Sequence, residues 1–272
     1  MSDTGPGTSG ADAPRLDAVR AELDAVDDKI LALLAERLKI ADGLPALKSD
    51  AVPMRPAREI QMMRRLIAAA SEPVEPDLIV ELWRVLIAAN VRRHGPVDVV
   101  VGGGADPVRL HDIARRHYGS RTRIHRATDP RAALSRAAET PNMVAIVPWP
   151  GPSGAGGWWP TLSESRYHKV ALIAALPFRG DRAADPEAAV FCKNVPLEPA
   201  GQDITVALAF DQHHRALKVL AEAGFNAREM ARSEPRVLYR IEGFVPADDV
   251  RVTSLARGGL DGFRIVGSFA RV

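Results

Sequence analysis

Two cations fall on the apolar side of one long predicted helix near the start of the chain. The hydrophobic members of this stripe recur at spacings of three and four residues: Leu16, Val19, Leu23, Val26, Ile30 and Leu33. Arg37 takes the next position, and Lys48 follows eleven residues later, rotated by about 20° and about 16 Å further along a straight helix. Burying a cation is costly unless it meets an anion, so the pattern favours either internal salt bridges or a bound anion.

A third cation, Arg20, lies on the same predicted helix, seventeen residues before Arg37. That spacing corresponds to roughly 25 Å along the axis, so one chain cannot bring both side chains to one small molecule. Two long helices that cross in a dimer could do so. The pattern therefore predicts a cationic, helix-walled pocket for a small dianion, shared between two copies of the chain.

Three predicted helices must position these side chains. They cover residues 15–41, 57–70 and 77–93, and their breaks coincide with Gly43, Pro45, Pro73 and Gly95. The third shows an apolar face with Leu78, Leu82 and Val85. A 27-residue helix cannot bury both its ends against two shorter ones, so this unit is expected to dimerise.

The run LDAVRAELDAVDDKILALLAERLKIA, followed by Lys48 and RPARE, resembles the all-helical chorismate mutases. The resemblance covers residues 15–94. It implies an intertwined helical homodimer that rearranges chorismate to prephenate without cofactor, metal or covalent intermediate. The same kind of pocket would also suit a related dianion such as isochorismate. Such a reaction needs a substrate held in a compact shape and fixed positive charge beside the developing oxyanion.

The resemblance also implies a role for each site residue. Arg20 would reach into the partner's pocket, and Arg37 and Arg58 would hold the substrate carboxylates. Lys48 would donate to the ether oxygen, with His94 as the second donor. Glu59 would bind the ring hydroxyl, and Asn90 would stand where the family has a small polar residue.

Three features depart from the family pattern. Gly43 and Pro45 interrupt the helix before Lys48, and Arg55 replaces an acidic residue before the proline that opens the second helix. His94 is not the usual donor, and a requirement for its protonated form would lower activity above neutral pH. These departures bear on rate and pH optimum rather than on fold.

The remainder of the chain resembles a prephenate dehydratase with a C-terminal ACT regulatory domain. Residues 97–148 alternate strands and helices, and residues 203–272 follow a β-α-β-β-α-β order that predicts a ferredoxin-like unit. The stretch VAIVPWPGPSGAGG lacks the acid and amide of the dehydratase motif, and FCKNVPLEP stands where its Thr-Arg-Phe is expected. Residues 181–202 are expected to be mostly irregular. We therefore expect no dehydratase activity.

The ACT-like region carries a reversed charge pattern. Arg232–Ser233–Glu234–Pro235 stands where phenylalanine-binding members carry Glu-Ser-Arg-Pro, so a scaffold role is favoured over amino-acid binding. The predicted fold class is multidomain: a disordered tail, an all-α mutase domain, an α/β dehydratase-like domain and a ferredoxin-like ACT domain. Their expected boundaries are 1–14, 15–95, 96–202 and 203–272.

Composition narrows the possible partners. The N-terminus lacks the charged and then apolar order of a secretory signal, and no apolar run is long enough to span a membrane. Cys192 is the single cysteine, so no disulfide framework is expected. Together these features predict a cytoplasmic protein. The histidines lack acidic or cysteine partners at metal-ligand spacing, which favours ordinary surface histidines over a metal site. Pro107 takes the third glycine position of a dinucleotide-binding loop at Gly102–Gly104, which disfavours a nicotinamide or flavin site. Ten arginines against four aspartates between Arg92 and Arg136 lack the aromatics of a nucleic-acid surface. A non-catalytic regulator that binds an aromatic amino acid or a partner enzyme is the alternative function.

Overall fold

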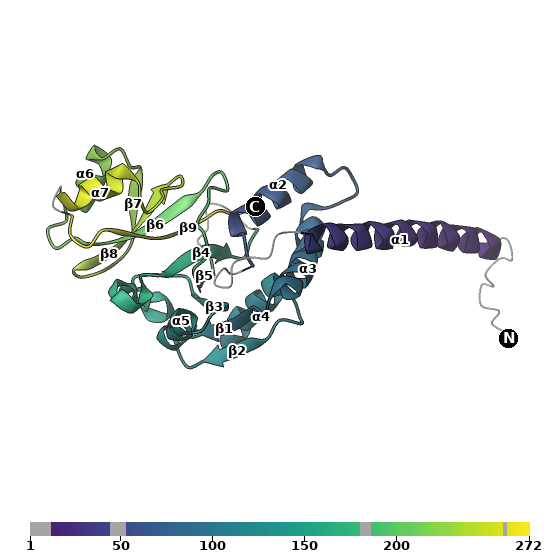
Figure 1. Cartoon of the computed structure of the whole chain (residues 1–272), viewed down its shortest axis with the longest axis horizontal. Helices are drawn as coiled ribbons and strands as arrows, with labels where there is room; N and C mark the ends of the chain where they lie inside the picture. Colours follow the sequence, from purple (N-terminus) through teal and green to yellow (C-terminus); the bar gives the residue numbers. More distant parts are fainter. Residues whose placement is uncertain (1–11, 44–52, 180–185, 258–259) are drawn as a thin grey trace, which may run out of the picture. The chain divides into compact units, whose positions relative to one another are not determined.

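The computed structural model describes residues 12–43, 53–179, 186–257 and 260–272 (Figure 1). Contacts divide the chain into two compact units, residues 1–46 and 47–272. In the described part of the chain, no helix is long and apolar enough to cross a membrane. The predicted boundaries at residues 95 and 202 stay predictions.

The described part of the first unit is the helix α1, Asp12–Asp42. It confirms the predicted long helix and its end before Gly43, whereas Pro45 and Lys48 lie outside the described residues. Its apolar stripe has no cover within the described part of its own unit. The six hydrophobic members, from Leu16 to Leu33, are between 47% and 64% exposed. A helix with such a stripe normally packs against another helix.

The helices α2, Pro56–Ala69, and α3, Pro76–His94, belong to the second unit. Both begin with proline, which suits the first helical position because it needs no backbone donor there. Ile60 and Met63 of α2 and Ile87 of α3 are buried in a core that α2 and α3 share with the following sheet. The face with Leu78, Leu82 and Val85 is instead exposed by 47% to 62%, so α3 buries its other apolar side.

A mixed sheet follows, with helices on both faces (Figure 1). Its elements are β1 Asp98–Gly102, α4 Pro107–Tyr118, β2 Ile124–Ala127, α5 Pro130–Glu139, β3 Met143–Pro148, β4 Val170–Leu176 and β5 Ala188–Lys193. Strands β2, β1 and β3 are parallel. Alternate strand residues pack with α2, α3 and α4 on one face, and with α5 on the other. Three short 3-10 turns follow between Gly154 and Tyr167, and the second and third of them pack on the α5 face through Trp159, Leu162 and Tyr167.

The expectation that residues 181–202 are mostly irregular is wrong for β5. This strand runs antiparallel between β3 and β4, where Phe191 pairs with Ala145 on one side and Leu172 on the other. Its sequence, AAVFCK, shows no alternation of apolar and polar residues because both faces of the strand are buried. Long-range pairing on both edges, which the local sequence does not reveal, defines this strand.

The last part of the chain confirms the predicted ferredoxin-like unit. Its elements are β6 Ile204–Phe210, α6 Ala216–Glu222, β7 Ala227–Ser233, β8 Arg236–Glu242, α7 Val250–Arg257 and β9 Arg264–Phe269. The strands lie in the order β9-β6-β8-β7, with antiparallel pairing from β9 to β7. Leu220 of α6 and Leu255 of α7 pack with Tyr239 in a core of this unit.

One continuous sheet of nine strands joins the two α/β parts. The joint is a parallel pairing of β4 with β9, at Leu172 and Gly267. A Cβ atom at Gly267 would lie 2.1 Å from the carbonyl oxygen of Leu172. Only glycine therefore permits the two backbones to approach this closely.

We expect Gly267→Ala to lower the free energy of unfolding by about 1–3 kcal/mol, because the added methyl group forces the two strands apart. Urea unfolding of the full chain measures the change. Gly151→Ala is the matched control, since a Cβ there would meet no atom within 4 Å. Equal unfolding midpoints for the two variants would show that the joint is not tight.

Candidate functional site

The predicted site residues are divided between the two units. Arg20 and Arg37 lie on α1, Arg20 paired with Asp17 at 3.1 Å between exposed side chains. Lys48 lies outside the described residues. Arg58, Glu59, Asn90 and His94 lie on α2 and α3 in the second unit.

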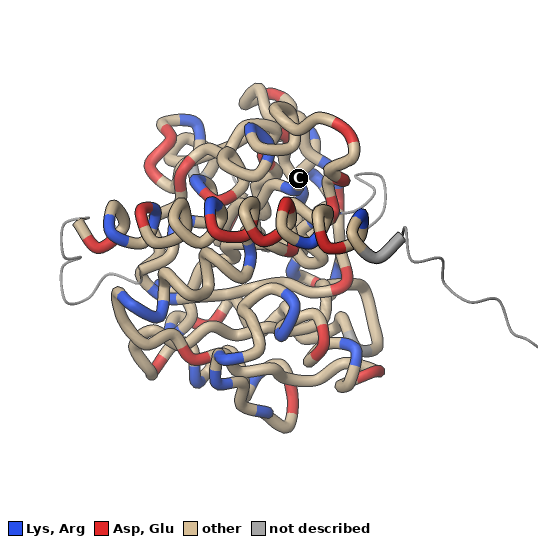
Figure 2. Tube along the Cα trace, turned by 90° about the vertical axis from the view of Figure 1, so that its right-hand side faces the viewer, with Lys and Arg blue, Asp and Glu red and all other residues tan. Residues whose placement is uncertain are grey.

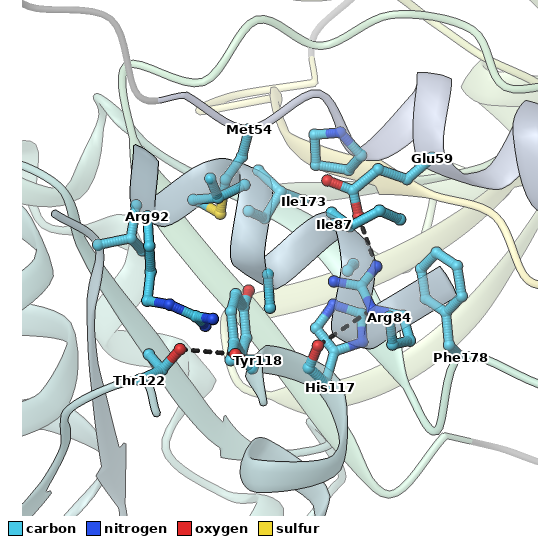
Figure 3. Close-up of a pocket in the computed structure, with 15 residues that line it drawn as sticks. Met54, Glu59, Arg84, Ile87, Arg92, His117, Tyr118, Thr122, Ile173 and Phe178 are labelled. Carbon is cyan, nitrogen blue, oxygen red and sulfur yellow. Dashed lines mark hydrogen bonds and ion pairs between the residues drawn. The ribbon is translucent and has the colours of Figure 1, made fainter. Parts of the chain in front are cut away.

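The residues on α2 and α3 differ in their surroundings. Arg58 is exposed on the first turn of α2, and His94 is exposed at the end of α3. Asn90 is half-buried one turn earlier on α3. Glu59 alone among these four lines the small cavity between α2, α3 and α4 (Figure 3). The roles predicted for all seven residues stay predictions.

Glu59 accepts a hydrogen bond from Arg84 of α3. The Oε2 atom of Glu59 lies 2.5 Å from Nη1 of Arg84, and the two side chains are only 14% and 7% exposed. The Nε atom of Arg84 donates to the backbone carbonyl of His117 at the end of α4, at 3.0 Å (Figure 3). One guanidinium thus links α2, α3 and α4. The attraction between the two opposite charges offsets the cost of burying them.

Aromatic side chains enclose this ion pair. The guanidinium of Arg84 lies 5.2 Å from the ring centroid of Phe178, whose ring also contacts His117. Burial, together with the positive charge of Arg84, holds the pKa of His117 well below its usual value. His117 is therefore neutral at physiological pH and packs as part of the core.

The space left beside Glu59 is too small for a substrate. The cavity has a volume of about 20 Å³. A cavity of roughly 10–15 Å³ holds one water molecule, so this one accepts little more. Among the described residues of the second unit, the cavity beside Glu59 is not of chorismate size.

Two further arginines connect the α2 region to the segment between β5 and β6 and to Arg271 near the end of the chain. Arg55 forms a bidentate pair with Glu198, at 2.5 and 3.1 Å. Arg64 donates to the backbone carbonyls of Ala200, Gly201 and Arg271. Arg55, which departs from the family pattern, thus has a structural function here.

Sequence reasoning missed Arg84, although a signal was present. Val80, Ile87 and Val91 recur on α3 with Arg84 between them, as Arg37 follows the stripe on the first helix. A cation at an inward-facing position requires an acidic partner or an anion. Here the partner is Glu59, which sequence analysis assigned to the substrate.

In the ferredoxin-like unit, Arg232 is surrounded by acidic groups of its own chain. It pairs with Glu229 at 2.6 Å, with Asp211 at 3.2 Å and with Glu234 at 3.2 Å. These partners, the hydrogen bond to Glu229 first among them, raise the pKa of Arg232. Asp211 also accepts from the hydroxyl of Tyr239 at 2.9 Å. This network fixes the loop before α6 to the turn between β7 and β8.

Charge is mixed rather than segregated. Figure 2 shows Lys and Arg interspersed with Asp and Glu along the trace. Arg109, within the arginine-rich segment, pairs with Glu187, and Arg116 pairs with Asp112. Among the described residues, no group of three or more His, Cys, Asp or Glu side chains could hold a metal ion.

Residues 19–95 match the family model of chorismate mutase type II. This segment contains α2, α3 and most of α1.

Two curated relatives are bifunctional chorismate mutase/prephenate dehydratases. The protein of Pseudomonas aeruginosa is 24% identical over 117 residues, covering 40% of this chain and 32% of the relative. The protein of Stutzerimonas stutzeri is 25% identical over 116 residues with the same coverage. The chain thus spans about a third of the length of the curated relatives it matches.

Among solved structures, the prephenate dehydratase of Streptococcus mutans is similar over 65% of this chain and all of its own, with 14% identity and a TM-score of 0.47.

We expect Arg84→Met to lower the free energy of unfolding by about 3–5 kcal/mol, because it leaves the Glu59 carboxylate buried without its cation. Thermal and urea unfolding measure the loss. Arg58→Met, an exposed neighbour on the same helix pair, is expected to change stability little.

Adding Glu59→Leu to Arg84→Met removes the stranded carboxylate and is expected to recover part of the stability. A double variant no more stable than Arg84→Met alone would contradict the ion-pair account.

Proposed function

We propose that the chain is a chorismate mutase that rearranges chorismate to prephenate in aromatic amino acid biosynthesis. The observation that carries the proposal is the match of residues 19–95 to the chorismate mutase type II family. The same segment contains Arg20, Arg37, Lys48, Arg58 and Glu59, which are the residue types that a dianion rearrangement requires. A cytoplasmic location is part of the same proposal.

The proposed chemistry is positioning plus electrostatics. Arg37 and Arg58 would hold the two carboxylates, since the arginine fork matches a carboxylate in a bidentate way. Lys48 would place a point charge at the ether oxygen, where negative charge grows as the bond breaks. Binding the compact conformer lowers the entropic part of the barrier. No group is transferred to the protein, and no proton has to move in the rearrangement.

The proposed active form is a homodimer assembled through α1. Its apolar stripe is exposed from Leu16 to Leu33, and the cavity beside Glu59 has only about 20 Å³. A partner's α1 would cover the stripe and bring Arg20 to the other end of the pocket. Both observations support a site that is completed between two copies.

We propose that residues 96–272 have a structural role and no dehydratase activity. The stretch FCKNVPLEP begins with the last three residues of strand β5, Phe191 to Lys193. Arg232 is engaged by three acidic side chains, which favours a scaffold over an amino-acid site.

A regulatory protein without catalysis is the second candidate function. The pairing of Glu59 with Arg84 favours it, because that carboxylate is then unavailable to a substrate hydroxyl.

The full chain is expected to consume chorismate and to yield prephenate, followed by the fall in chorismate absorbance. Arg37→Ala and Lys48→Ala should each lower kcat/KM at least about 100-fold, because each removes a charge from the transition state. Arg126→Ala, an exposed arginine on β2 outside the family match, is the matched control.

Wild-type rates in both the Arg37 and Lys48 variants would refute the pocket assignment. No turnover of chorismate by the wild type would favour the regulatory function. Formation of phenylpyruvate from prephenate would refute a purely structural role for residues 96–272.

Leu23→Glu combined with Leu33→Glu is expected to convert a dimer to a monomer, because both substitutions place charge on the stripe. Leu31→Glu is the control, since Leu31 is equally exposed on α1 but off the stripe. Light scattering coupled to size-exclusion chromatography gives the mass. A wild-type monomer, or equal effects of on-stripe and off-stripe changes, would exclude assembly through this face.

A further inference from the structure

A second cavity, between α3 and α4, has the size of a ligand site. Its volume is about 620 Å³, against about 20 Å³ beside Glu59. Small-molecule pockets usually measure roughly 300–1,000 Å³. All of its lining residues belong to the second unit, and the end of β4 with the residues after it closes one side.

The floor of this cavity is apolar. Ile113 of α4, Leu176 of β4 and Phe178 after it are each 5% exposed or less. Val80 and Val85 of α3 add to this surface, and Val85 is 62% exposed. A flat hydrocarbon ring would bury apolar area here that water now covers.

The walls of the cavity carry many charged side chains. Five arginines line it, against three acidic residues: Arg84, Arg109, Arg115, Arg116 and Arg179, with Asp77, Glu81 and Asp112. Most of these arginines already have a carboxylate partner. Arg109 pairs with Glu187, Arg116 with Asp112, and Arg179 with Asp77.

Arg115 differs from the other four. The hydrogen bond it makes in the structure goes from Nη1 to the carbonyl oxygen of Ser120, at 3.2 Å, and that bond carries no neutralising charge. A guanidinium has five N–H donors in a fork that fits a carboxylate. Donors of Arg115 therefore remain for an anion that enters the cavity beside it.

We propose that the cavity between α3 and α4 binds a small organic carboxylate with an apolar ring. The ring lies on Ile113, Leu176 and Phe178, and the carboxylate is held by Arg115. The free donors of Arg115 favour an anion, and the apolar floor disfavours a bare inorganic anion. This site is separate from the pocket proposed for chorismate, because it contains none of the residues assigned there.

The test uses the full chain and isothermal titration with three probes of one ring size: isophthalate, benzoate and benzyl alcohol. Saturable binding of the two carboxylates, and none of the neutral alcohol, is expected. Inorganic phosphate serves as a competitor that carries charge without a ring. Binding of phosphate with no binding of the carboxylates would overturn the proposal, as would equal binding of the alcohol.

Two variants locate the site. Arg115→Gln should weaken isophthalate binding at least fivefold, and Val85→Glu, which places a carboxylate at the cavity wall, should weaken it further. Arg126→Gln removes one exposed arginine elsewhere and should leave binding unchanged. Equal losses in the Arg115 and Arg126 variants would assign the effect to net charge and refute the site.

Melting curves of each variant confirm that it is folded before titration. Binding is measured without turnover, so its failure and the failure of mutase activity are distinguishable. Competition by chorismate that Arg37→Ala abolishes would assign the probe to the mutase pocket and overturn the proposal.

Discussion

The ion pair between Arg84 and Glu59 is the interaction on which the helical part of the second unit depends. It joins α2 to α3, and through the carbonyl of His117 it joins both to α4. Because both side chains are almost fully buried, neither charge is compensated by water if the other is lost. The hydrophobic contacts of Ile60, Met63 and Ile87 can be rearranged, but this pairing requires one geometry.

The three helices of the segment that matches the mutase family have different surroundings. The family match covers three helices, yet α2 and α3 bury their apolar faces in the core of the α/β unit. The stripe of α1 remains exposed within its own unit. The matching segment thus holds two helices anchored in the α/β unit and one helix whose apolar stripe has no cover within the described part of its own unit.

Much of the fold could be predicted from local sequence. Pro56 and Pro76 mark the starts of α2 and α3, and the β-α-β-β-α-β order of the last 70 residues predicted their sheet. Strand β5 could not be predicted, because its pairing partners are distant in sequence and both of its faces are buried. The pairing of Arg84 with Glu59 could not be predicted either. The acidic partner of Arg84 depends on how α2 crosses α3, which no spacing within either helix specifies.

The pairing of β4 with β9 has a consequence for shortened forms of this protein. Strand β4, VALIAAL, is apolar along its whole length, and β9 covers one of its edges. A chain cut before residue 203 would leave that edge open to any other strand. Long, uncharged edges of this kind pair with neighbouring molecules, so the C-terminal unit also acts as protection against aggregation. Selection could therefore retain the ferredoxin-like unit even if it never binds an effector.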